Sequence, residues 1–168
     1  DCEKLMPVLP LPVQSGSSKV LNSMNRKHNI FDYYKIIEKL KKVKPEIRFS
    51  SDFIIGYPGE TDDDFNQTIK LIEEVEFINS YSFIYSPRPG TPASRLDDID
   101  SKIAKKRLIK VQMLLEEKNS KYKKRFLTKS TEVLFENKLD KQNKYFGRDK
   151  FLNSVIIPSS QNLTGQLL

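Results

Sequence analysis

The chain has 168 residues and a net charge of +7 at pH 7, and 38% of its residues are hydrophobic against 30% charged. These proportions are typical of a folded protein in water and exclude a disordered chain, a collagen and a coiled-coil rod. Its longest apolar runs, such as residues 53–55, are far shorter than the roughly 20 residues that cross a bilayer, so we expect no membrane partner.

The single cysteine, Cys2, cannot form an internal disulfide, and the N-terminus has no initiating Met and no targeting segment. The chain stops at Leu168, within a predicted strand. We therefore expect a piece of a longer, cytoplasmic and monomeric protein.

The first part of the chain alternates between strand and helix patterns. The apolar run at residues 8–13 predicts a strand, and residues 14–17 predict the turn after it. Apolar residues spaced three and four apart predict a helix over residues 30–43. Residues 47–55 have the composition of a buried parallel strand, and a Gly-Tyr-Pro-Gly turn over residues 56–59 ends it.

The same alternation continues to residue 127. Thr61 is the predicted N-cap of a helix, residues 81–85 predict a strand, and residues 87–92 predict a rigid Pro-rich loop. Ser101 is the predicted N-cap of a long helix that follows. The expected core stripe of the Thr61 helix is Phe65, Ile69, Ile72 and Val75, and that of the long helix is Ala104, Leu108, Val111, Leu115, Tyr122 and Phe126.

These patterns predict an α/β fold in two parts. Strand and helix alternate over residues 1–127, which indicates a parallel sheet with right-handed crossovers. Residues 128–168 contain short apolar runs separated by turn residues such as Asp140 and Gly147, and they predict a small, truncated all-β module.

The positive charge is concentrated in one segment. Residues 102–130 contain 11 Lys and Arg but only two Glu, whereas residues 1–101 contain 13 Lys and Arg against 16 acidic residues. A solvated helix face is one interpretation, and a polyanion contact is the other. The second interpretation predicts nucleic-acid binding by Lys121, Lys123, Lys124 and Arg125.

The loops that follow the predicted strands are rich in Gly, Pro, Ser and Thr, and in parallel β/α folds such loops share one face that holds the active site. One such loop alone is an ordinary turn, but three together favour a ligand site. The candidate ligand-binding residues of these loops are Gln14, Ser15, Gly16 and Ser17 in the first, Gly56, Tyr57, Pro58, Gly59 and Glu60 in the second, and Ser86, Arg88 and Thr91 in the third.

Other kinds of site find little support. One histidine, His28, and one cysteine cannot build a zinc site or a Cys-His nucleophile pair. Asp62, Asp63 and Asp64 fit a charged first helical turn that needs no metal. No Walker loop or dinucleotide fingerprint occurs, so the sequence predicts no metal site and identifies no catalytic residue.

Four segments together resemble the radical S-adenosylmethionine methylthiotransferases, and more closely the tRNA 2-methylthioadenosine synthases. They are LPVQSGS at residues 11–17, MNR at 24–26, SSDFIIGYPGET at 50–61 and YSFIYSPRPGTPA at 81–93. The resemblance is collinear and covers essentially the whole chain. Pro10 is a departure, because the family usually has His before Leu-Pro-Val-Gln.

The resemblance implies a parent protein with an N-terminal methylthiotransferase domain, a partial TIM-like β/α barrel and a C-terminal TRAM domain. It implies two 4Fe-4S clusters, whose cysteine ligands this chain lacks, and S-adenosylmethionine as cofactor. Residues 1–127 would then be the C-terminal half of the radical SAM barrel, and residues 128–168 a truncated TRAM domain.

The implied reaction adds a methylthio group to C2 of an isopentenylated adenosine next to the tRNA anticodon. The chain alone is expected to be inactive, since it lacks the cluster cysteines. The resemblance implies that Gln14, Ser15, Asp52, residues 56–59 and Arg88 face S-adenosylmethionine. A ribosomal-protein methylthiotransferase and an RNA-binding module without chemistry remain alternatives.

Overall fold

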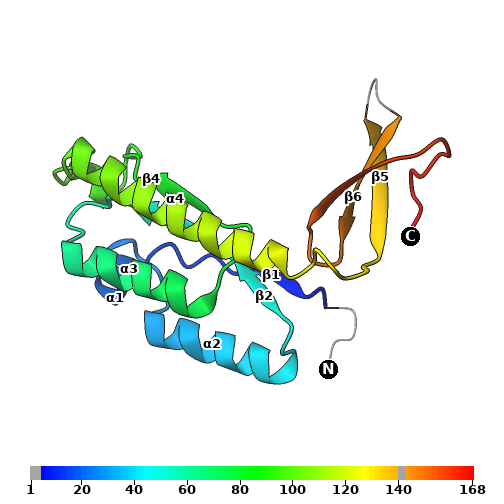
Figure 1. Ribbon diagram of the computed structural model, residues 1–168. Coiled ribbons are helices and arrows are strands. Elements are labelled where there is room, and N and C mark those ends of the chain that lie inside the picture. The colour runs from blue at the N-terminus through cyan, green and yellow to red at the C-terminus, as the bar shows by residue number, and fades with distance from the viewer. Residues whose placement is uncertain (1–4, 140–142) are drawn as a thin grey trace.

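The structure is a computed structural model that describes residues 5–139 and 143–168. An α/β region is followed by a smaller β-module, and the long helix α4 connects the two (Figure 1). The elements in chain order are β1 (Val8–Pro10), α1 (Ser18–Ser23), α2 (Ile30–Val43), β2 (Arg48–Ser50), β3 (Asp52–Ile55), α3 (Asp62–Val75), β4 (Tyr81–Ile84), the 3-10 helix η1 (Pro92–Arg95), α4 (Ser101–Lys124), β5 (Val133–Leu139), β6 (Lys144–Asp149) and β7 (Ser154–Pro158).

The strands of the α/β region pair in parallel, as the alternating sequence pattern predicts. β1 pairs with β2, and β3 pairs with β4 in the register Asp52↔Tyr81 to Ile55↔Ile84. An isolated parallel bridge between Gln14 and Phe53 continues the first pairing toward β3. The described residues therefore form a mixed α/β structure with small sheets, and they do not close a barrel.

The predicted single strand over residues 47–55 is wrong in one respect, because it is split at Ser51. The Ser51 amide donates to Ser80 Oγ at 2.9 Å, and the Ser51 hydroxyl accepts from the Val13 amide at 2.9 Å. Since side chains take the place of ladder partners at this residue, the ladder is interrupted between β2 and β3.

The caps explain where the helices begin. α2 spans the predicted residues 30–43, and α3 begins after Thr61, whose side chain accepts from the Asp64 amide in a capping box. α1 was missed, because its six residues are too few to show a helical period; Ser17 caps it by accepting from the Val20 amide. For α4 the predicted cap, Ser101, is wrong. The N-cap is Asp100, which accepts from the amides of Lys102 and Ile103.

One core holds the α/β region together. Phe49, Phe53 and Phe77 are each at most 1% exposed, and helices α2, α3 and α4 pack around them. The expected stripe residue Ile69 is only partly buried, whereas Leu71 is fully buried. Burying this aromatic and aliphatic surface provides the main driving force for folding of the region.

The β-module is an antiparallel meander with its own small core. β6 pairs with β5 on one side and with β7 on the other. The small core of the module consists of the buried residues Val133, Phe135, Tyr145 and Leu163. The predicted last strand is reduced to a bridge between Leu134 and Leu167. This part of the chain matches the predicted all-β texture.

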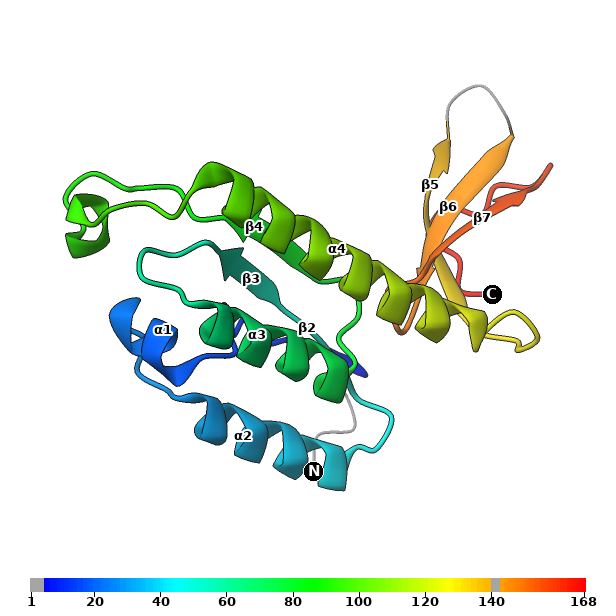
Figure 2. The same cartoon turned by 60° about the vertical axis from the view of Figure 1, so that its left-hand side comes forward.

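Helix α4 runs from one end of the α/β region to the β-module. Figure 2 shows the loops after β3 and β4 at one end of the α/β region and the β-module at the opposite end. Among the described residues, no helix combines the length and the apolar character that a membrane span requires.

Candidate functional site

Three loops at the carboxyl ends of the strands lie against one another, far from the β-module (Figure 2). We call residues 14–26, 56–60 and 85–93 the loop rim. Buried Val20, Tyr57 and Ala93, one from each loop, form a small apolar cluster with Met24 and Tyr85. The structure thus brings the three predicted loops together.

A cavity of about 720 Å³ opens among these loops. Its volume lies in the range of small-molecule sites. Two arginines, Arg26 and Arg88, line the cavity, and no Asp or Glu does. The cavity therefore favours a ligand with an anionic group. The lining residues are Gln14, Ser23, Met24, Asn25, Arg26, Ile54, Tyr57, Phe83, Ile84, Tyr85, Ser86, Arg88, Thr91, Pro92 and Ala93.

Gln14 occupies a strained position at this cavity. Its φ is 74°, in the left-handed region that residues other than Gly rarely adopt. Two backbone bonds hold it there: the Gln14 amide donates to Asp52 O at 3.0 Å, and the Ile54 amide donates to Gln14 O at 2.9 Å. Arg26 then donates to the Gln14 side-chain oxygen. The fixed backbone holds the amide side chain at the cavity.

Tyr57 and Tyr85 form the aromatic wall of the cavity. Their ring centroids lie 5.0 Å apart with the planes at 72°, and the Tyr57 hydroxyl donates to Ser23 O at 2.9 Å. Burial, and then the neighbouring Tyr85, raises the pKa of Tyr57. The Tyr85 hydroxyl is buried without a hydrogen-bond partner among the described residues, so a ligand group is a natural partner for it.

The predicted site residues fall into two groups. Gln14, Tyr57 and Arg88 line the cavity. The remainder lie behind or beside it: Ser15 is 1% exposed and bonded within the protein, Asp52 is the first residue of β3, and the residues of the 56–59 turn other than Tyr57 do not line the cavity. Contact of any of these residues with a cofactor stays a prediction.

A buried ion pair that the sequence did not reveal fixes the turn after β3. Arg107 of α4 donates to Glu60 Oε1 at 2.7 Å, and the Gly56 amide donates to the other oxygen of Glu60 at 3.1 Å. The two side chains are 9% and 2% exposed. At the same place a Cβ on Gly56 would lie 2.9 Å from Ala104 Cβ. The ion pair and the close approach of Gly56 to Ala104 therefore hold this turn against α4.

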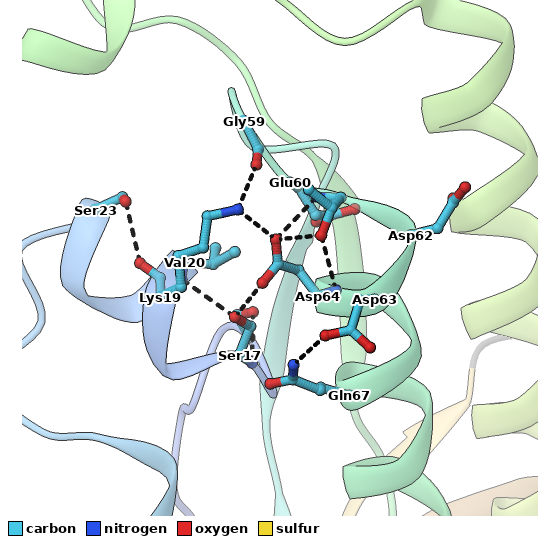
Figure 3. Close-up of polar contacts among 12 residues, drawn as sticks. Ser17, Lys19, Val20, Ser23, Gly59, Glu60, Asp62, Asp63, Asp64 and Gln67 are labelled. Atoms are coloured by element: carbon cyan, nitrogen blue, oxygen red, sulfur yellow. Dashed lines mark hydrogen bonds and ion pairs between the residues drawn. The ribbon is translucent and has the colours of Figure 1, made fainter.

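A second polar cluster connects α1 to α3 (Figure 3). Asp64 accepts from the Ser17 hydroxyl at 2.6 Å, the Thr61 hydroxyl at 2.7 Å and the Lys19 ammonium at 2.8 Å. Lys19 also donates to Gly59 O at 3.2 Å, so it bridges to the second loop. The cluster positions two loops of the rim relative to each other.

Glu60 and Asp64, the two buried carboxylates that hold the rim loops, have opposite pKa shifts. Burial raises the pKa of Glu60, and Arg107 only partly opposes the rise. Burial acts on Asp64 in the same direction, but hydrogen bonds from Lys19, Ser17 and Thr61 outweigh it and hold the pKa of Asp64 well below its usual range.

No metal-binding group of three or more His, Cys, Asp or Glu residues occurs within residues 5–139 and 143–168. In the acidic run, Asp62 binds Arg107 at 2.8 Å and Asp64 turns inward as part of the cap. His28 lies beside the ring of Tyr33. Cys2 lies outside the described residues.

Comparison with known proteins shows what the chain is similar to. Residues 3–72 match the model of the radical SAM superfamily. The tRNA-2-methylthio-N(6)-dimethylallyladenosine synthase of Pelagibacter ubique is 52% identical over 98% of this chain and 37% of that protein. The enzymes of the same name from Wolbachia pipientis wMel and Neorickettsia sennetsu are each 47% identical over 95% of the chain, and over 37% and 34% of their own lengths.

The chain is therefore similar to the radical SAM superfamily over residues 3–72, and over nearly its whole length to part of these synthases. It spans about 37% of the length of the Pelagibacter and wMel relatives. The radical SAM family implies S-adenosylmethionine and iron-sulfur chemistry.

The residues present in this chain fit one of those groups and not the other. Two guanidinium groups, an aromatic wall and a Tyr85 hydroxyl without a partner in the described ranges suit a ligand that carries a carboxylate, hydroxyls and an adenine ring, as S-adenosylmethionine does. A 4Fe-4S cluster needs several cysteine thiolates, and the chain has a single cysteine. The chain alone therefore does not provide a cluster site.

The predicted RNA-binding residues all lie on or just after the last turns of α4. Lys121 is paired with Glu117 at 2.5 Å, and Arg125 lies 3.6 Å from Glu76. Lys123 and Lys124 are exposed, and no ion pair involves them within the described residues. Nucleic-acid binding by this set stays a prediction.

Proposed function

We propose that the whole protein is a tRNA methylthiotransferase. It would add a methylthio group to C2 of an isopentenylated adenosine next to the anticodon, with S-adenosylmethionine as cofactor and two 4Fe-4S clusters bound outside this chain. One observation carries the proposal: the 52% identity to the Pelagibacter synthase extends over 98% of the chain, including all three loops of the rim. The enzyme would act in the cytoplasm as a monomer.

The division of the chain follows from the same proposal. Residues 1–127 would be the C-terminal part of a partial parallel β/α barrel, and residues 128–168 a truncated TRAM domain. The parallel pairing of β1 with β2 and of β3 with β4 supports the first assignment, and the antiparallel β5-β6-β7 meander supports the second.

In the proposed cofactor site, residues of the rim bind and orient S-adenosylmethionine, which supplies the radical when bound. Arg88 presents a fork of donors suited to a carboxylate. Tyr57 offers an aromatic edge and face for the adenine ring, and Gln14 offers an amide to ribose or adenine. Ser15, Asp52, Gly56, Pro58 and Gly59 would shape the backbone around these groups.

The activity test uses the full-length protein, reconstituted with iron and sulfide and incubated with S-adenosylmethionine and tRNA that carries the isopentenyl but not the methylthio group. We expect the methylthio nucleoside in digests analysed by mass spectrometry. Absence of that nucleoside, with intact clusters in the absorption spectrum, would reject the proposal.

A parallel incubation with ribosomal protein tests the sister activity, which the family resemblance also accommodates. Modification of the ribosomal protein but not of the tRNA would transfer the assignment to that activity. If neither is modified but tRNA binds, an RNA-binding role without chemistry remains, for which the basic end of α4 is the supporting feature.

A further inference from the structure

A groove of about 390 Å³ lies beside strand β4. Helix α4 forms its other wall, and Figure 2 shows β4 running alongside this helix. We call it the β4 groove. The lining residues that carry the argument are Tyr81, Ser82, Phe83, Gln112, Glu116 and Asn119.

β4 has one edge without a hydrogen-bonded neighbour in the described chain. It is an end strand with β3 on its other side, and the Tyr81 amide donates to Ser51 O at 3.0 Å on that side. Because the N–H and C=O groups of successive residues alternate between the two edges of a strand, those of Ser82 and Ile84 point away from β3. Within residues 5–139 and 143–168 these groups form no backbone hydrogen bond with a further segment. They are free to pair with another strand.

This edge lacks the features that prevent strand pairing. Residues 77–86 contain neither a charged residue nor a Pro, although 30% of the chain is charged. The end strands β1 and β7, by contrast, finish at Pro10 and Pro158. Natural proteins protect exposed strand edges with Lys, Pro or bulges, because an open edge is a template for pairing. An uncharged edge without such protection indicates a strand that is covered in the complete protein.

Side chains around the groove have unused hydrogen-bonding capacity. Ser82 Oγ and Asn119 Oδ1 are buried and have no partner among the described residues. Gln112 of α4 adds an exposed amide to the same lining. Hydroxyl and amide groups of this kind suit the N–H and C=O groups of an extended backbone. The groove therefore favours a polypeptide over an apolar ligand.

The groove also has exposed rings and a carboxylate. Tyr81 and Phe83 are 65% and 55% exposed, although both belong to a strand. Glu116 of α4 forms no ion pair within the described ranges. Side chains of an added strand would pack against the rings, and a Lys or Arg among them would pair with Glu116. These features suit an extended segment that carries a cationic side chain.

We propose that an extended segment of the same protein, from outside these 168 residues, pairs with the free edge of β4. The proposal rests on the proposed function, because it takes the whole protein to have the length of the synthases. The chain matches 37% of the Pelagibacter and wMel relatives, so nearly two thirds of such a protein could supply the strand. A segment of the same molecule has a high effective concentration at β4, which favours it over a separate protein.

Hydrogen exchange in the full-length protein tests the pairing directly. Relative to their intrinsic rates, the amides of Ser82 and Ile84 should exchange about 100-fold more slowly than an exposed loop amide, because the added strand has to open first. The reference is the amide of Asp98, which is exposed and has no hydrogen-bond partner among the described residues. Relative rates for Ser82 and Ile84 equal to that of Asp98 would overturn the proposal.

Photo-cross-linking identifies the source of the strand. Tyr81→p-benzoylphenylalanine in the full-length protein should, on irradiation, join position 81 to a peptide from outside residues 1–168 of the same molecule. Phe31→p-benzoylphenylalanine is the matched control, since Phe31 is 72% exposed on α2 and should not join that peptide. A covalent dimer from position 81, or no cross-link to such a peptide, would overturn the proposal.

These measurements need neither clusters nor tRNA, so they are independent of the activity test. Slow exchange of Ser82 and Ile84 in a protein that forms no methylthio nucleoside would reject the proposed function and support the strand pairing. Fast exchange of the same amides in an active enzyme would reject the strand pairing alone.

Discussion

The two ends of α4 differ in how their polar groups are satisfied. At the loop rim, buried Glu60 and Asp64 have protein partners within hydrogen-bond distance. At the C-terminal end of α4, Arg48 and Lys150 form no ion pair with any described residue. Buried polar groups whose hydrogen bonds are all made within the protein hold the loops in fixed positions. Unpaired cations on a surface remain able to bind an anion. The contrast assigns a scaffolding role to the buried carboxylates Glu60 and Asp64, which hold the rim loops in place.

Helix α4 also separates the two ends. Its 24 residues correspond to about 36 Å at the usual rise of an α-helix. A partner that reaches both ends must be elongated, and a folded RNA with a stem meets that requirement. Removing groups at each end should therefore give different kinds of effect.

The largest effect on stability is expected from Arg107→Met. It leaves Glu60 buried without its cation, and breaking such a buried pair lowers the free energy of unfolding by about 3–5 kcal/mol. Urea denaturation measures the change. Because the pKa of Glu60 is already raised, protonation relieves the penalty, so the loss should be smaller at acidic than at neutral pH.

Two further variants test whether the pair itself is responsible. Combining Arg107→Met with Glu60→Gln should recover part of the loss, and Lys110→Met, one turn along α4, should change stability little. If the combined variant is as unstable as the sum of the single ones, the two side chains are not coupled.

Asp64→Asn is expected to have the next largest effect. Hydrogen bonds to a charged group each contribute about 1.5–3 kcal/mol, and we expect a loss of about 2–3 kcal/mol at neutral pH. Because the folded-state pKa is lowered, this stabilisation is present above the usual Asp value of about 4 and is lost as pH falls below it. Unfolding at several pH values should show the difference between Asp64→Asn and the unmodified protein shrinking in acid.

The exposed neighbour gives the matched control. Among the described residues, Asp63 accepts from exposed Gln67 alone, at 2.8 Å, so Asp63→Asn should change stability by less than about 0.5 kcal/mol. A larger effect from Asp63 than from Asp64 would contradict the described cluster.

Where α4 meets the β-module, Phe151→Ala is expected to cost about 2 kcal/mol. It removes ring contacts with Phe126 and Tyr122, and aromatic pairs contribute about 0.5–1.5 kcal/mol each beyond their burial. Thermal unfolding measures it against Phe31→Ala, since Phe31 is 72% exposed and should tolerate the change. Equal effects of the two substitutions would mean that these ring contacts do not hold α4 against the β-module.

The smallest effect concerns the start of α4. Asp100→Ala should lower the free energy of unfolding by about 1 kcal/mol, the usual contribution of an N-cap side chain. Ser101→Ala should change it by only a few tenths, since Asp100 and not Ser101 caps the helix. The reverse order in denaturation experiments would restore the cap predicted from sequence.

Local signals account for what the sequence predicted well. The period of residues 30–43 and the capping box at Thr61 act within a few residues, and both appear in the structure. Adjacent cap residues, Asp100 and Ser101, are locally equivalent, so the sequence did not decide between them. The six-residue helix α1 is too short for a period, although Ser17 was a readable cap signal.

Contacts between distant segments explain what the sequence missed. The Glu60–Arg107 pair joins residues 47 positions apart, and nothing in either segment marks the other as its partner. The cavity between β2, the end of α4 and the β6–β7 turn likewise combines Arg48 with Lys150. The acidic run at 62–64 was predicted as a helix terminus, which is right, but the tertiary bond of Asp64 to Lys19 depends on the fold. Side-chain partners of this kind follow from tertiary packing and not from pattern.

The division of labour between the two ends is tested most directly by measuring two affinities in the same two full-length variants. Arg88→Gln should weaken S-adenosylmethionine binding about tenfold, the equivalent of about 1.4 kcal/mol, and leave tRNA affinity unchanged. The combined Lys123→Gln and Lys124→Gln variant should weaken tRNA binding and leave S-adenosylmethionine affinity unchanged. If either variant changes both affinities by the same factor, the rim and the basic end of α4 are not separate sites.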